Sequence, residues 1–222
     1  MTDVPDEVTR PRKRRGLPIW VHFLAAILTV ALVQNFVVRT GRVPSGSMEL
    51  TLTPGQIIAA DRVSIRWNPV KSQDVIVFTA GEDWRGDAPR IGGPVDAVRW
   101  ALGALGFGPG LEVLMVKRII GLGGQQVGCC DSEGRITVDG QPLEEPYIYE
   151  DYEFVPGQLD CLSGSLRCFG PIEVPEGKLL VLGDHRSRSA DSVYQCRGEG
   201  QPGCARFVDE HDVVGRVLGT GG

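Results

Sequence analysis

The chain has few of the groups on which metal sites and nucleic-acid-binding surfaces depend. It contains only three histidines, no Cys-x-x-Cys pair and no His-rich spacing, so the sequence gives no support to a zinc site. Its net charge is −5, which argues against nucleic acid as a partner because phosphate binding requires a basic face. No internal repeat is visible, and only one apolar run is long enough to cross a membrane.

That apolar run lies near the N-terminus and predicts a membrane-spanning helix. Residues 16–38 contain no Asp, Glu, Lys or Arg, and a helix needs roughly 20 residues to cross the hydrocarbon core. Five basic side chains fall within residues 10–15, so the positive-inside rule keeps a tail over 1–16 in the cytoplasm. We therefore expect an uncleaved anchor over 17–38 and an extracytoplasmic part over 39–222. The alternative is a cleaved signal peptide, but the run does not end in a small-residue cleavage site.

The part of the chain after residue 38 is long enough for one sizeable core and predicts a mainly β fold. Short apolar runs bounded by Pro, Gly and polar residues are typical of strands. Such runs fall at residues 56–60, 74–78, 114–120, 135–138, 179–182 and 212–218. The helical candidate is residues 95–105, which have one apolar face. This helix could rest on the membrane surface or pack on the core.

Six cysteines suit an oxidising exterior. They form three pairs that are close in sequence: Cys161 with Cys168, Cys196 with Cys204, and Cys129 with Cys130. The first two pairs bracket short Gly-containing loops, and we expect each to form a local disulfide. The third pair is adjacent in the chain, and the sequence leaves open whether it forms a vicinal disulfide or stays reduced.

A serine turn follows the apolar run. Pro44 has a fixed φ and Gly46 permits a tight bend, so Ser45 and Ser47 can point toward one place. A serine hydroxyl attacks a carbonyl only when a base removes its proton, and the resulting oxyanion needs donors close by. Alone, the segment also fits an ordinary Pro-Ser-Gly turn after a helix.

A lysine in a strand-like stretch is a candidate base for this serine. Strand alternation puts Lys117 on one face with Met115 and Ile119, and Arg118 on the other. An amine acts as a base at neutral pH only if desolvation lowers its pKa from about 10.4 by roughly two units. Arginine cannot lose its proton in this way. The alternative is an edge strand with both cations in solvent.

Histidine is the more usual base for a serine, and the sequence offers three. His22 lies in the membrane segment, and His211 lies in an acidic, solvated run. His185, in the sequence Gly-Asp-His-Arg, is the serious alternative to Lys117.

Three sequence boxes follow the anchor in order. They are Ser-Gly-Ser-Met at 45–48, Lys-Arg-Ile-Ile-Gly-Leu-Gly-Gly at 117–124 and Gly-Asp-His-Arg-Ser-Arg-Ser-Ala-Asp-Ser at 183–192. Together with the strand at 73–78, they resemble the type I signal peptidases (leader peptidases), particularly the Gram-positive, actinobacterial kind. The resemblance implies an extracytoplasmic antiparallel β catalytic domain, with an inserted accessory β subdomain over about 128–176.

The resemblance also implies roles for five residues. They are Ser47 as nucleophile, Lys117 as general base, Ser45 as oxyanion donor, Ser189 as the hydroxyl that orients the lysine amine, and Asp191 as structural support. Asp191 would act through an ion pair with an arginine, for which Arg118 is a candidate. His185 falls where the family usually has asparagine, which weakens the Ser-His alternative.

Four positions depart from the family pattern. They are Leu50 and Gly123, where proline is usual, Gln125, where aspartate is usual, and Val193, where arginine is usual. None of them is a proposed catalytic group. The Val193 departure removes one possible partner for Asp191.

The substrate class follows from the resemblance and the expected topology. Enzymes of this kind cut exported preproteins after small residues, typically Ala-x-Ala, at the outer membrane surface, and an extended peptide would add to a sheet edge. The expected partners are signal peptides, the lipid bilayer and, functionally, the export machinery. No metal ion, organic cofactor or nucleic acid is expected.

Three other classes of protein fit the sequence less well. A soluble self-cleaving Ser-Lys repressor would have a DNA-binding domain and no anchor. A sortase-like transpeptidase would need a cysteine in a suitable strand, which the sequence lacks. A non-enzymatic anchored β-domain would need no reactive serine.

Overall fold

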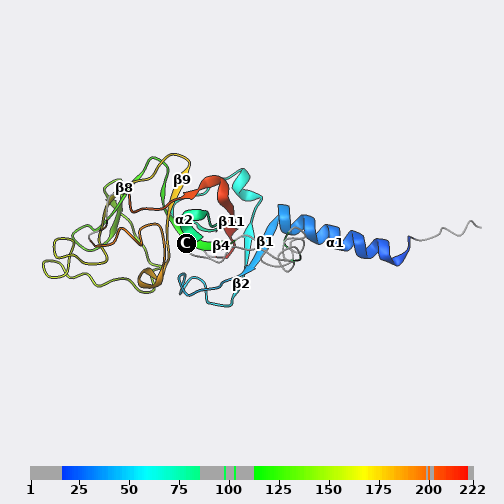
Figure 1. Ribbon diagram of the computed structural model, residues 1–222, viewed down its shortest axis with the longest axis horizontal. Coiled ribbons are helices and arrows are strands. Elements are labelled where there is room, and N and C mark those ends of the chain that lie inside the picture. The colour runs from blue at the N-terminus through cyan, green and yellow to red at the C-terminus, as the bar shows by residue number, and fades with distance from the viewer. Residues whose placement is uncertain are drawn as a thin grey trace, which may run out of the picture.

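A long helix projects from a body of strands and connecting loops (Figure 1). The computed structural model describes residues 17–85, 98, 103, 113–198, 200 and 203–219. The helix expected over 95–105 lies outside these described residues except for Val98 and Gly103.

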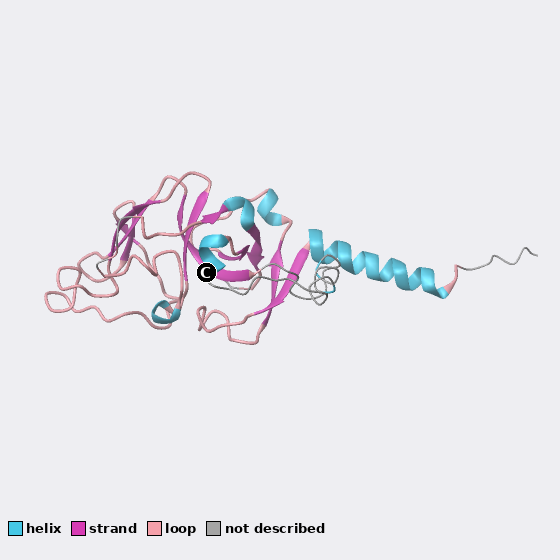
Figure 2. Cartoon of the chain, viewed as in Figure 1, coloured by secondary structure: helices cyan, strands magenta, loops and turns pink. Residues whose placement is uncertain are grey.

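Helix α1 (Ile19–Phe36) is built from the apolar run and carries no charged residue. It follows Pro18 and is the one helix among the described residues that is long and apolar enough to cross a membrane. Ala31 is its only buried residue, whereas side chains such as Trp20 and Phe23 are exposed. Figure 2 shows the helix standing clear of the strands. Its apolar surface is therefore not covered by the described part of the chain.

The first sheet contains seven strands, and every pairing in it is antiparallel. Their order is β1 (Val38–Arg42), β2 (Ile57–Asp61), β11 (Val213–Val217), β3 (Val75–Thr79), β4 (Leu114–Leu122), β9 (Lys178–Leu182) and β10 (Val208–Asp209). Strand β1 begins two residues after α1 ends, so the helix joins the sheet directly.

The second sheet is inserted between two neighbouring strands of the first. Its order is β7 (Gln141–Pro142), β6 (Ile136–Val138), β5 (Gln126–Cys129) and β8 (Phe169–Glu173). All four strands lie between β4 and β9 in sequence, and those two strands pair with each other. The domain boundary expected at about 128–176 remains a prediction.

The central strands are buried on both sides. In β3, Val75 and Val77 belong to one apolar cluster, and Ile76 and Phe78 belong to another. This explains why β3 is a continuous apolar run in the sequence. A third cluster contains Ile120, Leu180 and Phe169 and joins the two sheets, so the insert shares a core with β4 and β9.

The short helical elements connect these strands. They are η1 (Ser64–Arg66), α2 (Glu82–Arg85), η2 (Arg186–Arg188) and η3 (Glu210–Asp212). The predicted mainly β fold class is confirmed, and each of the six apolar runs coincides with or overlaps a strand. Strands β1, β5, β7, β8 and β10 lie outside these runs. Charge, Gly or Pro interrupts the apolar pattern of β1, β5 and β8, and β7 and β10 are only two residues long.

Candidate active site

Ser47 lies in the loop between β1 and β2, and its residue surface is only 6% exposed. The loop is anchored on both sides, because the Val43 amide donates to the Gln56 carbonyl and the Gly55 amide donates to the Val43 carbonyl. Met48, next to the serine, is buried in the apolar cluster below it. The packing of the loop therefore fixes the position of the serine.

Lys117 lies in the central strand β4, opposite Ile76 of β3, and is 3% exposed. Its Nζ is 2.6 Å from Ser47 Oγ. Burial lowers the pKa of Lys117 to about 8, although the negative charge of Asp191 opposes the shift. With a pKa of about 8, about a tenth of the amine is neutral at pH 7. The two groups have the geometry of a nucleophile and its base.

Two further serines lie at this site. Ser45 Oγ is 3.3 Å from Ser47 Oγ. Ser189 is 3% exposed, and its Oγ has no hydrogen-bond partner within the described part of the chain. Gly183 lets these segments meet: a Cβ there would lie 2.5 Å from the Ser47 carbonyl oxygen and closer still to Ser189 Oγ. The serine turn and the third box are therefore in direct contact.

The arginine proposed as the partner of Asp191 was the wrong one. Arg118 instead forms a buried ion pair with Asp184, at 2.7 Å, and stacks on the Tyr147 ring. Asp191, which is fully buried, has Arg197 at 3.9 Å and accepts the amide of Gly183 at 3.3 Å. Asp184 and Asp191 belong to the same sequence box, so the sequence does not indicate which arginine pairs with which aspartate. The fold decides the pairing.

His185 is buried, but its side chain is directed at a carboxylate. Its Nδ1 is 2.9 Å from Glu49 Oε2, whereas Ser47 Oγ accepts its hydrogen bond from Lys117. His22 lies on α1, and the His211 side chain is 79% exposed. Among the described residues, no histidine bonds to Ser47 Oγ. The contact of His185 with Glu49 was not anticipated, because nothing in the spacing of the two residues indicates it.

A small cavity of about 50 Å³ lies beside the serine and lysine. It is lined by Val43, Pro44, Ser45, Ser47, Met48, Leu114, Met115, Val116 and Lys117. A larger cavity of about 200 Å³, around Trp84 and Arg206, shares no lining residue with it. The larger cavity is favoured by size alone, but Ser47 and Lys117 line the smaller one.

The departures from the family pattern are accommodated locally. Gly123 packs so closely on the turn before β9 that a Cβ would lie 3.1 Å from Glu176 Cα. Gln125 accepts the Leu122 amide and donates to Asp139, which holds the turn. Leu50 is 73% exposed, and Val193 is buried in the core shared with the insert.

All six cysteines form disulfides. The bonds join Cys129 to Cys130, Cys161 to Cys168 and Cys196 to Cys204. The two predicted local pairs are confirmed, and the adjacent pair is bonded as well. The sulfurs of Cys130, Cys161 and Cys168 are close together but are committed to these bonds.

Known proteins match the chain over most of its length. A family profile described as signal peptidase, peptidase S26, matches residues 17–219. A probable signal peptidase I of Mycobacterium leprae (strain TN) is 37% identical over 205 residues, covering 85% of this chain and 68% of the relative. Signal peptidase I of Mycobacterium tuberculosis (strain ATCC 25618 / H37Rv) is 38% identical over 205 residues, covering 88% and 67%.

A solved structure also matches. It is a signal peptidase I from Enterococcus faecalis V583, at 23% identity and a TM-score of 0.37, and the match covers 67% of this chain and 97% of that one.

Proposed function

Because the chain belongs to the signal peptidase family, peptidase S26, we propose that it removes signal peptides from exported preproteins with a Ser47–Lys117 dyad. The enzyme is a hydrolase of this family. The observation that carries the proposed dyad is the 2.6 Å contact between a buried amine and a buried serine hydroxyl.

The reaction proceeds through an acyl-enzyme. Neutral Lys117 takes the proton of Ser47 Oγ as that oxygen attacks the scissile carbonyl, and the ammonium then gives the proton to the departing amine. Lys117 next removes a proton from water, the hydroxide attacks the ester, and Ser47 recovers its proton. A hydroxyl and an amine supply the nucleophile and base, so the proposal invokes no metal ion or organic cofactor.

Ser45 and Ser189 assist these two groups. The Ser45 hydroxyl is close enough to Ser47 Oγ to turn toward the oxyanion that forms on the carbonyl under attack. Ser189 Oγ is buried without a partner among the described residues, which leaves it free to bond and orient the Lys117 amine. Asp191 supports the loop by accepting the Gly183 and Val193 amides.

Cleavage after small residues is supported by the size of the cavity beside the dyad. About 50 Å³ leaves room for a small side chain but not for a large one. Residues 114–116 of β4 form one wall, so an extended peptide can lie along this strand while its side chain enters the cavity. This favours substrates of the Ala-x-Ala type.

The apolar helix supports a single-pass anchor. Its exposed side chains require an apolar environment, and the basic residues before it favour a cytoplasmic N-terminus with the catalytic domain outside. Functional coupling to the export machinery follows from the substrate class and belongs to this proposal.

The test is cleavage of a purified preprotein by the full chain in detergent, with the N-terminus of the product sequenced. Ser47→Ala and Lys117→Ala should each abolish cleavage, whereas expression and membrane insertion stay normal. The Ser-Lys mechanism is wrong if Lys117→Ala keeps full activity and His185→Ala loses it.

A further inference from the structure

His185 is buried at the dyad, but the proposed chemistry does not use it. It lies between β9 and η2 and is 2% exposed. The groups that contact His185 come from two other segments of the chain. One is the serine turn, and the other is the stretch around Glu150 in the insert.

On the first side, His185 contacts the serine turn twice. Its backbone amide donates to the Ser47 carbonyl at 3.1 Å, and its Nδ1 is 2.9 Å from Glu49 Oε2. A carboxylate only accepts, so Nδ1 carries the hydrogen. The Glu49 carboxylate in turn lies over Gly46, where a Cβ would be 2.8 Å from Oε2. The imidazole therefore fixes a carboxylate against the glycine that precedes Ser47.

On the second side, the insert supports the imidazole. Its Nε2 is 3.6 Å from Glu150 Oε1 and makes no hydrogen bond within the described residues. The Tyr149 ring packs edge-on against the imidazole, with the two ring centroids 5.0 Å apart. The backbones are joined as well: the Arg186 amide donates to the Glu150 carbonyl, and the Tyr149 amide donates to the Asp184 carbonyl.

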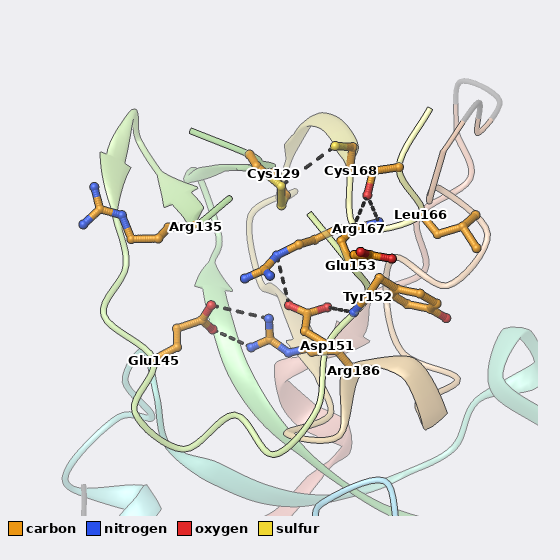
Figure 3. A network of polar contacts seen from close by, with 12 residues as sticks. Cys129, Arg135, Glu145, Asp151, Tyr152, Glu153, Leu166, Arg167, Cys168 and Arg186 are labelled. Carbon is orange, nitrogen blue, oxygen red and sulfur yellow. Dashed lines mark hydrogen bonds and ion pairs between the residues drawn. A yellow bond between two sulfur atoms is a disulfide. The ribbon is translucent and has the colours of Figure 1, made fainter. Parts of the chain in front are cut away.

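A buried ion pair holds this same junction. The Arg186 guanidinium pairs with the Glu145 carboxylate, and Figure 3 shows the two side chains facing each other. Arg186 Nε also donates to the Gly183 carbonyl. These contacts of Arg186 hold the loop that carries His185 independently of its contacts with the serine turn.

We propose that His185 is a positioning residue, whose Nδ1 bond to Glu49 holds the serine turn so that Ser47 Oγ faces Lys117. The role rests on the proposed Ser-Lys function, and it differs from the role of a base because the imidazole bonds to a carboxylate and not to the nucleophile. The insert thereby contributes to the site through Tyr149 and Glu150, which lie between β7 and β8.

Two amide substitutions can distinguish the roles of the two ring nitrogens of His185. The nitrogen of an asparagine side chain is as many bonds from Cα as Nδ1, and that of glutamine is as many as Nε2. His185→Asn can therefore keep the Glu49 bond, whereas His185→Gln directs its amide toward Glu150. Neither amide can act as a general base at neutral pH.

The experiment measures kcat and KM for preprotein cleavage by the full chain in detergent. We expect His185→Asn to stay within about threefold of the wild type in kcat, and His185→Gln and His185→Ala to lose about tenfold or more with KM little changed, the size expected for a hydrogen bond to a charged group. His211→Ala, at an exposed histidine, is the matched control and should leave both constants unchanged.

A second series tests whether Glu49 is the partner. Glu49→Ala should lower kcat as much as His185→Ala does, and the double variant should be no worse than either single one, because each removes the same bond. Equal losses in His185→Asn and His185→Gln, full activity in His185→Ala, or additive losses in the double variant would overturn the proposal. An inactive wild type would instead overturn the proposed function.

Discussion

The Lys117 amine is placed where its charged form is unfavourable. Its burial moves the pKa from 10.5 to about 8, which corresponds to about 3 kcal/mol of lost stability when the amine is protonated. The same shift makes a neutral base available near pH 7. Burial of this amine therefore lowers the free energy of unfolding while it provides a neutral base, a combination that is common at catalytic sites.

Lys117→Met should remove activity and raise stability. At pH 7 both the folded and the unfolded chain carry a protonated Lys117, so the cost of burial is fully present, and the methionine should increase the free energy of unfolding by up to about 3 kcal/mol. The gain should shrink as the pH rises from about 8 and vanish by about 10.5. Denaturant unfolding at several pH values measures this.

The pH dependence of the wild type provides the kinetic counterpart. Because the proposed mechanism uses the neutral amine as the base, kcat/KM should rise about tenfold per pH unit below pH 8 and level off above it. Lys71→Met, at an exposed lysine, should change neither stability nor the profile. A wild-type profile that is flat between pH 6 and 9 would contradict the assignment of Lys117 as the base.

At the scale of elements, the loop after β9 makes three separate side-chain contacts. It brings Asp184 to Arg118, His185 to Glu49 and Asp191 to Arg197. Arg197 is adjacent to Cys196, whose disulfide to Cys204 fixes the segment that places the guanidinium beside Asp191. Val193 occupies the position where the family usually has arginine, and Arg197 supplies a positive charge from four residues further along the chain.

Arg197→Ala should shift the pH profile as well as destabilise the fold. Without the guanidinium, the negative charge of buried Asp191 acts more strongly on Lys117, which raises the pKa of the lysine and moves the rise in kcat/KM to higher pH. An unpaired buried carboxylate should also cost about 3 kcal/mol of stability, measured by denaturant unfolding.

Arg197→Lys keeps the charge and should restore most of the profile, whereas Arg66→Ala, at an exposed arginine, should have no effect. An unshifted profile in Arg197→Ala would show that Arg197 does not influence the lysine.

Much of the fold could be predicted from local patterns, whereas the contacts within the site depend on its tertiary arrangement. The apolar runs indicated β3 and β9, because strands buried on both sides are continuously hydrophobic, and they indicated β4 because apolar residues flank its two cations. Strand β8 could not be predicted in this way, because Gly170 and Pro171 interrupt its apolar pattern.

The pairing of Arg118 with Asp184, and the close approach of Gly183 to Ser47, have no signature in sequence spacing, since they join segments far apart in the chain. Ser47 and Lys117 were recognisable because each had its own local motif.

At the scale of the whole molecule, helix α1 makes few contacts with the strands. Helix α1 has one buried residue, whereas β1 is paired along its whole length with β2. Near the junction, Gln34 bonds to Thr40, whereas β1 pairs with β2 through residues that follow the helix. The proposed dyad belongs to elements that follow β1, because Ser47 lies in the loop after it and Lys117 lies in β4.

A chain that begins at Val38 should therefore fold and cleave a short soluble peptide with kcat/KM close to that of the full chain in detergent. Its processing of a preprotein inserted in vesicles should fall by about 100-fold, because the anchor no longer confines enzyme and substrate to one surface. Replacing α1 with an unrelated apolar helix of equal length is the matched control and should restore processing. If the shortened chain processed the inserted preprotein as fast as the full chain, α1 would not serve to hold the dyad at the membrane. If it failed on the soluble peptide too, α1 would instead be needed for the integrity of the β fold.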